Sequence, residues 1–249
     1  MAVGIDLGSR AVKLVEYDGA AITRRQAFDT AAFYRDFGRL KDGTLEVDFA
    51  GIGINPAGRL TVTGYGRNTI KVVGAKVVSE VKAHTVGAVR QSGLKDFTLL
   101  DIGGQDSKVM KVSGGAMEDF AMNDKCAASS GRYIENMAAI LAMPLDELSR
   151  HFTNPVRLSA TCAIFGESEI IQKVAEGVPA EEIAAGVNLT IVKRVLPMLA
   201  RYPDGPVVFS GGVARNTAVA RLIQETTGRK VVTLPEPTFN GALGCALLS

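Results

Sequence analysis

The chain begins with a run of apolar positions that a single acidic residue interrupts. Residues 3–7 are apolar or glycine except for Asp6, and Gly8 and Ser9 follow as typical turn residues. Residues 11–17 then form a second run with apolar side chains at alternating positions, which is typical of a strand. The sequence therefore opens with two predicted strands, and a carboxylate stands at the end of the first one.

The same pattern recurs about 95 residues further along the chain. Residues 97–101 are apolar up to Asp101, glycines follow at Gly103 and Gly104, and residues 108–112 form the next predicted strand. A strand, an aspartate, a glycine turn and a second strand therefore occur twice. This spacing indicates two related halves rather than an array of many short repeats.

After the second copy, the period of the apolar positions predicts mostly helices. The predicted helices span residues 73–89, 130–142, 144–151, 163–177, 180–201, 217–227 and 240–248. The remaining predicted strands span residues 60–66, 207–210 and 230–234, and residues 30–50 give mixed signals. The alternation of strands and helices indicates an α/β fold.

Composition and charge exclude several classes of function. The 249 residues are 47% hydrophobic and 22% charged, which is enough to bury a core. The net charge is only +2 and Trp is absent, so neither nucleic acid nor an acidic membrane surface is an expected partner. No uncharged run reaches the ~20 residues that span a bilayer, and no signal peptide is recognisable. We therefore expect a cytoplasmic protein without a membrane segment.

Each copy of the repeated pattern has the residue types of a phosphate-binding turn. Glycine lets the backbone N–H groups approach an anion, and the carboxylates fit if Mg²⁺ and its water ligands lie between them and the phosphates. A single strand–Asp–x–Gly is a common strand ending, so the prediction depends on the duplication. The candidate residues are Asp6, Gly8, Ser9 and Lys13 in the first copy, and Asp101, Gly103, Gly104, Gln105, Asp106 and Lys108 in the second.

A third glycine element follows the strand at residues 207–210. Gly211 and Gly212 stand between this strand and a predicted helix, where a flat adenine has room to lie on the backbone. A tight strand-to-helix turn is an equally good explanation of this pair by itself. Together, the three elements predict nucleotide binding between two lobes, and no G-x-x-x-x-G-K-[S/T] loop is present.

Seven segments carry a resemblance to known proteins: Gly4–Ser9, Thr63–Asn68, Asp101–Lys108, Phe120–Ala128, Ser159–Glu169, Ser210–Ala214 and Asn240–Gly244. In them the sequence resembles the actin, sugar kinase and heat-shock ATPase superfamily. Within it, the sequence is similar to the BadF/BadG/BcrA/BcrD group, which activates 2-hydroxyacyl-CoA dehydratases or forms subunits of benzoyl-CoA reductase. The resemblance implies duplicated ribonuclease H-like lobes, at residues 1–95 and 96–239, with a closing helix at residues 240–249 that packs on the first lobe.

The resemblance and the position of the turns together define the expected ATP site. Gln105 and Asp106 stand beside the second turn and are expected to position the attacking water, and Asp6 and Asp101 complete the predicted catalytic group. The residues expected to bind ATP or ADP are Gly8, Ser9, Arg10, Lys13, Gly103, Gly104, Gln105, Lys108, Gly211, Gly212, Val213, Asn216, Asn240 and Gly241.

The three cysteines show no C-x-x-C motif. Cys126 and Cys162 are 36 residues apart, and each shortly precedes a predicted helix. By itself such a pair is more often buried packing than a metal site. The resemblance implies that they ligate a [4Fe–4S] cluster, one per homodimer, because an all-cysteine cluster takes four thiolates. Cys245 lies in an apolar helix and is expected to be core.

The resemblance further implies an ATPase coupled to low-potential electron transfer. The expected partners are a two-subunit dehydratase or reductase that accepts the electron, and ferredoxin or flavodoxin that supplies it. A small-molecule kinase and an ATP-dependent reactivating chaperone of the same superfamily are the alternatives, and neither needs iron. His84 and His151 are expected to be surface or helix-packing residues.

Overall fold

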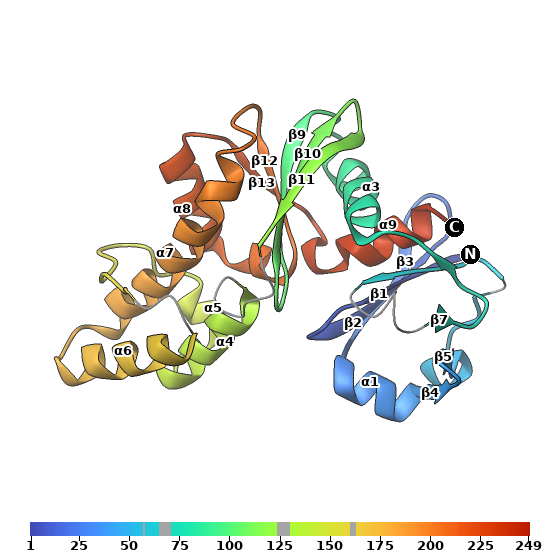
Figure 1. Cartoon of the computed structure of the whole chain (residues 1–249), viewed down its shortest axis with the longest axis horizontal. Helices are drawn as coiled ribbons and strands as arrows, with labels where there is room; N and C mark the ends of the chain where they lie inside the picture. The colour runs from blue at the N-terminus through green and yellow to red at the C-terminus, as the bar shows by residue number, and fades with distance from the viewer. Residues whose placement is uncertain (57, 65–70, 124–129, 160–162) are drawn as a thin grey trace. The chain divides into compact units, whose positions relative to one another are not determined.

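The computed structural model describes residues 1–56, 58–64, 71–123, 130–159 and 163–249 (Figure 1). The chain divides into two compact units. Unit 1 contains residues 1–95, 114–117 and 238–249, and unit 2 contains residues 96–113 and 118–237. No helix in the described part of the chain is long and apolar enough to cross a bilayer.

Unit 1 is built on a five-stranded sheet of order β3-β2-β1-β6-β8. β1 is antiparallel to β2 and parallel to β6. The strands of this sheet are β1 (Ala2–Leu7), β2 (Ala11–Tyr17), β3 (Ile22–Asp29), β6 (Leu60–Gly64) and β8 (Lys76–Val77). A second sheet contains β4 (Gly38–Lys41), β5 (Thr44–Val47) and β7 (Lys71–Val72), and the helices are α1 (Thr30–Phe37), α2 (Phe49–Ile52), α3 (Glu80–Ser92) and α9 (Asn240–Leu247).

The two faces of the main sheet in unit 1 pack against different elements. Val3, Ile5 and Leu7 share a buried cluster with side chains of α1, α2 and the small sheet. Because side chains alternate along a strand, Asp6 lies on the opposite face, where β1 packs against α9. Gly4 permits that packing, since a Cβ at this position would overlap the backbone of α9.

Unit 2 repeats this topology in a sheet of order β11-β10-β9-β12-β13. β9 is antiparallel to β10 and parallel to β12. Its strands are β9 (Phe97–Ile102), β10 (Ser107–Ser113), β11 (Ala116–Met122), β12 (Val207–Ser210) and β13 (Val231–Thr233). Its helices are α4 (Gly131–Ile140), α5 (Leu145–Leu148), α6 (Ala163–Ala175), α7 (Ala180–Leu199) and α8 (Thr217–Thr227), with a short 3-10 helix at Gly212–Arg215. A second short 3-10 helix, Pro237–Phe239, lies where the chain passes from unit 2 to unit 1.

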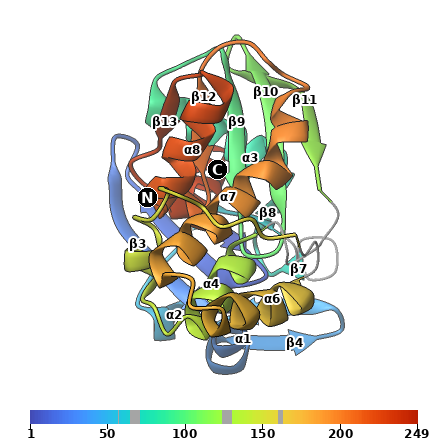
Figure 2. The same cartoon turned by 90° about the vertical axis from the view of Figure 1, so that its left-hand side faces the viewer.

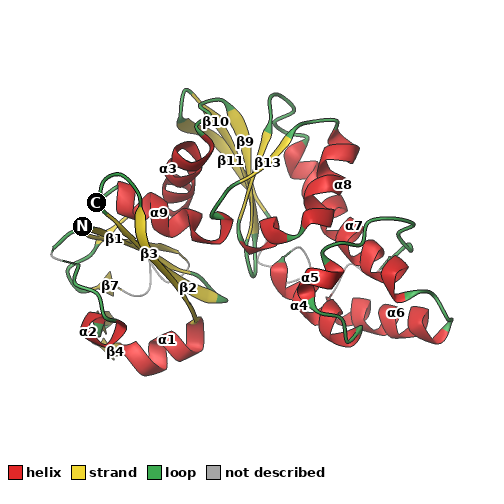
Figure 3. Ribbon diagram, turned by 180° about the vertical axis from the view of Figure 1, so that it is seen from behind, coloured by secondary structure: helices red, strands yellow, loops and turns green. Residues whose placement is uncertain are grey.

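Helices cover one face of the sheet in unit 2. α7 and α8 lie over it in Figure 2, and Figure 3 shows α4, α5 and α6 grouped beside α7. Leu100, Ile102 and Phe209 belong to the large buried cluster that these helices share with the sheet. Alternation along β9 therefore places Asp101 on the sheet face opposite this cluster.

The structure corrects one predicted element and adds strands that were not predicted. The predicted helix at residues 73–89 begins only at Glu80, because the short strand β8 precedes it. β3 and β11 were not predicted. Each lies at the edge of its sheet with nearly all of its side chains exposed or half-buried, so neither has the continuous buried run of a central strand.

Candidate functional site

The first turn, residues 8–10, follows the end of β1. Asp6 is 4% exposed and stands opposite Lys13 in the register of β1 and β2. Lys13 Nζ lies 3.3 Å from Asp6 Oδ2. A Cβ at Gly8 would lie 2.7 Å from the same ammonium, so the charge of Lys13 lies directly against the turn that Gly8 and Ser9 form.

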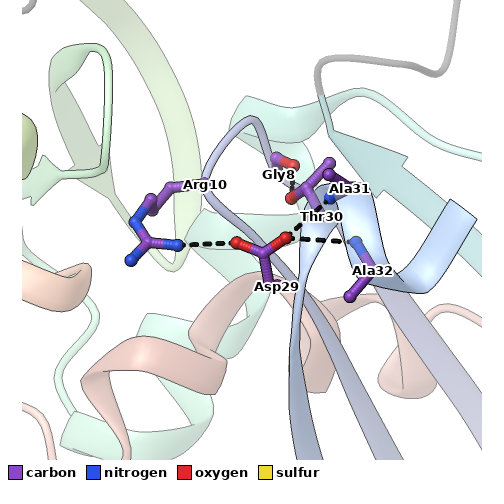
Figure 4. A network of polar contacts seen from close by, with 6 residues as sticks. All are labelled: Gly8, Arg10, Asp29, Thr30, Ala31 and Ala32. Atoms are coloured by element: carbon purple, nitrogen blue, oxygen red, sulfur yellow. Dashed lines mark hydrogen bonds and ion pairs between the residues drawn. The ribbon is translucent and has the colours of Figure 1, made fainter. Parts of the chain in front are cut away.

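Residues at the start of α1 contact this turn through a hydrogen bond and an ion pair (Figure 4). Arg10 Nη1 lies 2.9 Å from Asp29 Oδ2, and the hydroxyl of Thr30 donates to Gly8 O at 2.8 Å. The other oxygen of Asp29 accepts from the N–H groups of the first helical turn. The hydrogen bond from Ala32 N–H is the main reason that the pKa of Asp29 lies below its usual value. Arg10, an expected nucleotide ligand, therefore already has a carboxylate partner.

Asp6 is also close to two side chains of α3. One ligand atom each of Asp6, Glu80 and His84 lies within 4.8 Å of the others. A Cβ at Gly241 would lie 2.7 Å from His84 Nε2 and 3.2 Å from Asp6 Oδ2, so the glycine at the start of α9 leaves space beside both groups. Glu80 was not among the site residues predicted from the sequence. The signal that could have indicated it is its spacing from His84, because residues four apart on a helix lie on one face.

The side chain of Asn240 joins α9 to α3. Its Nδ2 donates to His84 O at 2.9 Å, and its Oδ1 accepts from Gln91 Nε2 at 3.0 Å. Asn240 is fully buried, so packing alone explains this residue. His84 is 6% exposed, which makes it a helix-packing residue rather than a surface residue. Cys245 is buried as expected, and burial raises the pKa of its thiol.

The second turn, residues 103–106, follows the end of β9 in the same way. Asp101 is 2% exposed and stands opposite Lys108 in the register of β9 and β10. Lys108 is also buried, and its Nζ lies 2.9 Å from Asp106 Oδ2. Gly103 N–H donates to Asp106 O at 2.9 Å and closes the turn. The repeated sequence pattern thus places a strand-end aspartate opposite a lysine in both units.

Gly104 and Gln105 occupy the middle of the second turn and are half-buried. Among the residues that the structure describes, neither of their N–H groups has a hydrogen-bond partner. Backbone N–H groups in a glycine turn, beside a buried lysine, are a typical anion-binding arrangement. The turn therefore has the donors and the charge that a phosphate requires.

The two glycines after β12 differ in what surrounds them. Gly211 has φ 86°, and a Cβ there would overlap the carbonyl of Ile102, so close packing requires glycine. A Cβ at Gly212 would meet no atom within 4 Å. The following residue, Val213, is 5% exposed and packs beside Gly131 at the start of α4. Of these two glycines, Gly212 is the one with open space beside its Cα among the described residues.

Asn216, another expected nucleotide ligand, uses its side chain inside unit 2. Its Oδ1 accepts from Val219 N–H at 3.0 Å and caps α8. Its Nδ2 donates to Asn188 Oδ1 at 2.8 Å, and Asn188 in turn donates to the carbonyls of Leu148 and His151. This buried amide network links α5, α7 and α8.

The expected cluster ligands Cys126 and Cys162 lie outside the described residues. The described chain resumes at Ser130, directly before α4, and at Ala163, the first residue of α6. The two helices expected to follow the cysteines are therefore present. Both belong to unit 2.

Solved structures with this architecture define the class of protein. The chain superimposes on the activator of the 2-hydroxyisocaproyl-CoA dehydratase from Clostridium difficile with bound ADPNP, with TM-score 0.84 and 31% identity over 99% of this chain and 93% of that one. A more distant structure, the ethanolamine utilization protein EutJ from Carboxydothermus hydrogenoformans, has TM-score 0.59 and 19% identity over 100% and 90% of the two chains. The fold is that of the actin-like ATPases, as the sequence predicted.

Within this class, the chain belongs to the BadF/BadG/BcrA/BcrD ATPase family, which it matches over residues 3–249. It is 36% identical to the (R)-2-hydroxyglutaryl-CoA dehydratase activating ATPase of Acidaminococcus fermentans, over 98% of this chain and 95% of that protein. It is 35% identical to the activator of lactoyl-CoA dehydratase of Anaerotignum propionicum, with the same coverage. The resemblance found in the sequence is confirmed.

Proposed function

We propose that this protein is an ATP-dependent activator that transfers a low-potential electron to a 2-hydroxyacyl-CoA dehydratase or a related acyl-CoA reductase. The observation that carries the proposal is the repeated site, in which a buried aspartate stands opposite a lysine at each of two glycine turns. Full-length relatives named as dehydratase activators support the choice of partner. Ferredoxin or flavodoxin is the proposed electron donor, and the cytoplasm is the proposed location.

ATP binding is assigned to the residues of both turns. The ammonium groups of Lys13 and Lys108 supply positive charge. The N–H groups of Gly104 and Gln105, which have no acceptor among the described residues, supply hydrogen bonds to phosphate oxygens. Gln105 and Asp106 position the attacking water. The space beside Gly212 takes the adenine. Hydrolysis by such a site is mainly a matter of positioning and charge stabilisation.

Mg²⁺ fits the carboxylates of this site. Asp6, Glu80 and Asp101 offer the oxygen ligands that this hard cation prefers, whereas the imidazole of His84 suits softer ions. We assign Asp6 and Asp101 to hold Mg²⁺ through its water ligands, with Glu80 as a further acceptor. The ion neutralises phosphate charge when it is bound.

The cysteines fit a [4Fe–4S] cluster by the chemistry of their thiolates. Cys126 and Cys162 supply two ligands per chain, so a symmetric homodimer supplies the four that a cluster takes. Exposed apolar side chains flank both cysteine segments: Phe120 and Met122 precede Cys126, and Phe165 follows Cys162. Such side chains are typical of a surface that a partner covers. The cluster supplies the electron when it is bound.

The test is a set of cysteine variants purified without oxygen. We expect Cys126→Ser and Cys162→Ser to lose the brown colour and dehydratase activation while still binding MgATP. Cys245→Ser is the matched control and keeps both, because Cys245 is buried packing. Retention of the cluster in Cys126→Ser would refute the ligand assignment. A wild-type protein without iron that phosphorylates a small molecule would instead favour a kinase.

A further inference from the structure

Arg10 of the first turn and Asp29 at the start of α1 form an ion pair inside unit 1 (Figure 4). Asp29 ends β3 and stands opposite Ala11, the first residue of β2, so the register of these strands brings its carboxylate beside the turn. The hydroxyl of Thr30 donates to Gly8 O at 2.8 Å and ties the turn to the same helix start. The distance between the turn and Asp29 is therefore set by the fold of unit 1.

The two carboxylate oxygens of Asp29 have different partners. Oδ1 accepts from Ala31 N–H at 3.0 Å and from Ala32 N–H at 3.1 Å, which caps α1. Oδ2 lies 2.9 Å from Arg10 Nη1. The hydrogen bond from Ala32 N–H lowers the pKa of Asp29, so this carboxylate is charged at neutral pH. Because the cap uses Oδ1, Arg10 can leave Oδ2 while α1 stays capped.

The ion pair is weak enough for a phosphate to replace it. The side chains of Arg10 and Asp29 are 46% and 53% exposed. An exposed ion pair shifts an equilibrium by only about 1.5- to 5-fold. Arginine binds phosphate through charge-assisted hydrogen bonds that can be bidentate, and these are about twice as strong as hydrogen bonds between neutral groups. A nucleotide phosphate at the first turn is therefore a stronger partner for the guanidinium than Asp29 is.

The turn that precedes Arg10 has further groups for a phosphate. Gly8 O points toward Thr30, and the described chain contains no cis peptide bond, so the N–H of Ser9 points away from Thr30. The ammonium of Lys13 lies against the same turn. A phosphate bound there lies near the guanidinium of the next residue, Arg10. If one guanidinium held both this phosphate and Asp29, two like charges would lie close together, and this repulsion favours exchange over sharing.

We propose that Asp29 competes with the nucleotide phosphates for Arg10, so that Arg10 is a phosphate-binding residue whose availability Asp29 limits. The inference rests on the proposed function, because it takes the first turn to bind phosphate. In the nucleotide-free chain the guanidinium pairs with Asp29. When the nucleotide binds, the guanidinium moves to a phosphate and Asp29 remains the cap of α1. Asp29 thereby stabilises the nucleotide-free chain and weakens nucleotide binding.

The test is a double-mutant cycle on the full-length chain, with the Kd for MgATP measured by isothermal titration calorimetry. Asp29→Asn removes the charge and keeps the helix cap, because Asn and Asp are equally favoured at this position. We expect this variant to bind MgATP about 2- to 5-fold tighter than wild type, the usual range for an exposed ion pair. Arg10→Gln binds about 10-fold weaker or more, because it loses a charged hydrogen bond. The double variant has the same Kd as Arg10→Gln, because no guanidinium is left to compete for.

Asp36→Asn is the matched control. Asp36 lies on the same helix, and its Oδ1 lies 2.7 Å from Arg35 Nε in an exposed ion pair. Among the described residues, the hydrogen bonds that Asp36 accepts with its side chain come from Arg35 and not from the turn. The substitution changes the net charge by the same amount as Asp29→Asn, and we expect the Kd to stay within about 1.5-fold of wild type. Equal tightening in both variants would show a general effect of charge and would overturn the competition.

Two further results overturn the inference. Unchanged or weaker binding in Asp29→Asn would show that Asp29 does not compete for Arg10. Tightening that persists when Arg10→Gln is also present would show an effect that does not pass through Arg10.

The proposed function can fail separately, because the titration needs no cluster. A wild-type protein that binds MgATP but carries no iron contradicts the proposed function and leaves the mutant cycle interpretable. A protein that carries iron and binds MgATP, but shows no tightening in Asp29→Asn, contradicts the competition alone. A wild-type protein that does not bind MgATP contradicts both.

Discussion

Lys108 Nζ lies 2.9 Å from Asp106 Oδ2, and the lysine side chain is only 3% exposed. A buried ammonium that is paired with a carboxylate is costly unless its charge has a use. The position of Lys108 beside the second turn gives this charge a use, because phosphate oxygens are the anions expected there. Lys13 occupies the equivalent position on β2, beside the first turn. Its Nζ lies 3.3 Å from Asp6 Oδ2.

Replacing Lys108 tests this relationship. We expect Lys108→Met to lower the kcat of ATP hydrolysis by roughly 10²–10³-fold, the usual effect of removing one electrostatic contact to the transition state. Lys111→Met is the control, because Lys111 stands on the same strand in an exposed pair with Glu118. Exposed pairs contribute little, so its kcat stays within about 2-fold of wild type. Equal losses in both variants would contradict the role of Lys108.

Gly212→Ala separates the two explanations of the glycine pair after β12. A Cβ at residue 212 meets nothing within 4 Å, so the free energy of unfolding stays within about 0.5 kcal/mol of wild type. If the adenine occupies this space, the Kd for ATP rises, as isothermal titration calorimetry measures. Gly211→Ala differs, because its φ of 86° costs an alanine roughly 1–3 kcal/mol. An unchanged Kd in Gly212→Ala would show that the residue serves the turn alone.

Asn216→Ala tests whether this residue belongs to the nucleotide site or to the framework of unit 2. The variant loses the cap of α8 and leaves Asn188 Oδ1 without its donor, so we expect unfolding to become easier by about 2–4 kcal/mol. Denaturant unfolding measures this change. Below the melting transition, the Kd for ATP stays the same. A large rise in Kd without loss of stability would instead support the ligand role expected from the sequence.

Asp29 gives a prediction on pH. Its pKa is lowered, mainly by the hydrogen bond from Ala32 N–H, so its charge stabilises the fold at pH values above the usual pKa near 3.8. That stabilisation is lost as the pH falls through the lower pKa of the folded state. We expect wild type to melt above Asp29→Asn at pH 7, and the difference in Tm to shrink on acidification. A difference that grows as the pH falls would contradict this assignment.

The duplicated turns were predictable because all of their signals are local. Asp6 and Asp101 stand at strand ends beside glycines, and each lysine follows seven residues later in register. The approach of Glu80 and His84 to Asp6 was not predictable, because it depends on how α3 packs on α9 and how α9 packs on β1. That packing is set by glycines such as Gly244, where a Cβ would overlap the backbone of α3.

Asn216, in unit 2, also shows that contacts between distant segments cannot be predicted from the sequence. Its position before a helix is a local signal for a cap, whereas its partner Asn188 lies on another helix and could not be inferred from spacing. The anchoring of Ser130 to the second turn is likewise a contact between segments 26 residues apart. Residue types at a motif are visible in the sequence, but their partners are set by tertiary packing.

The central claim is that two chains share one iron–sulfur cluster through Cys126 and Cys162. Native mass spectrometry of anaerobically purified protein, combined with iron and sulfide determination, tests it most directly. We expect a dimer with about four iron and about four sulfide ions per two chains, and a cluster-free protein for the double Cys126→Ser, Cys162→Ser variant. A wild-type monomer with its own complete cluster, or a dimer without iron, would contradict it.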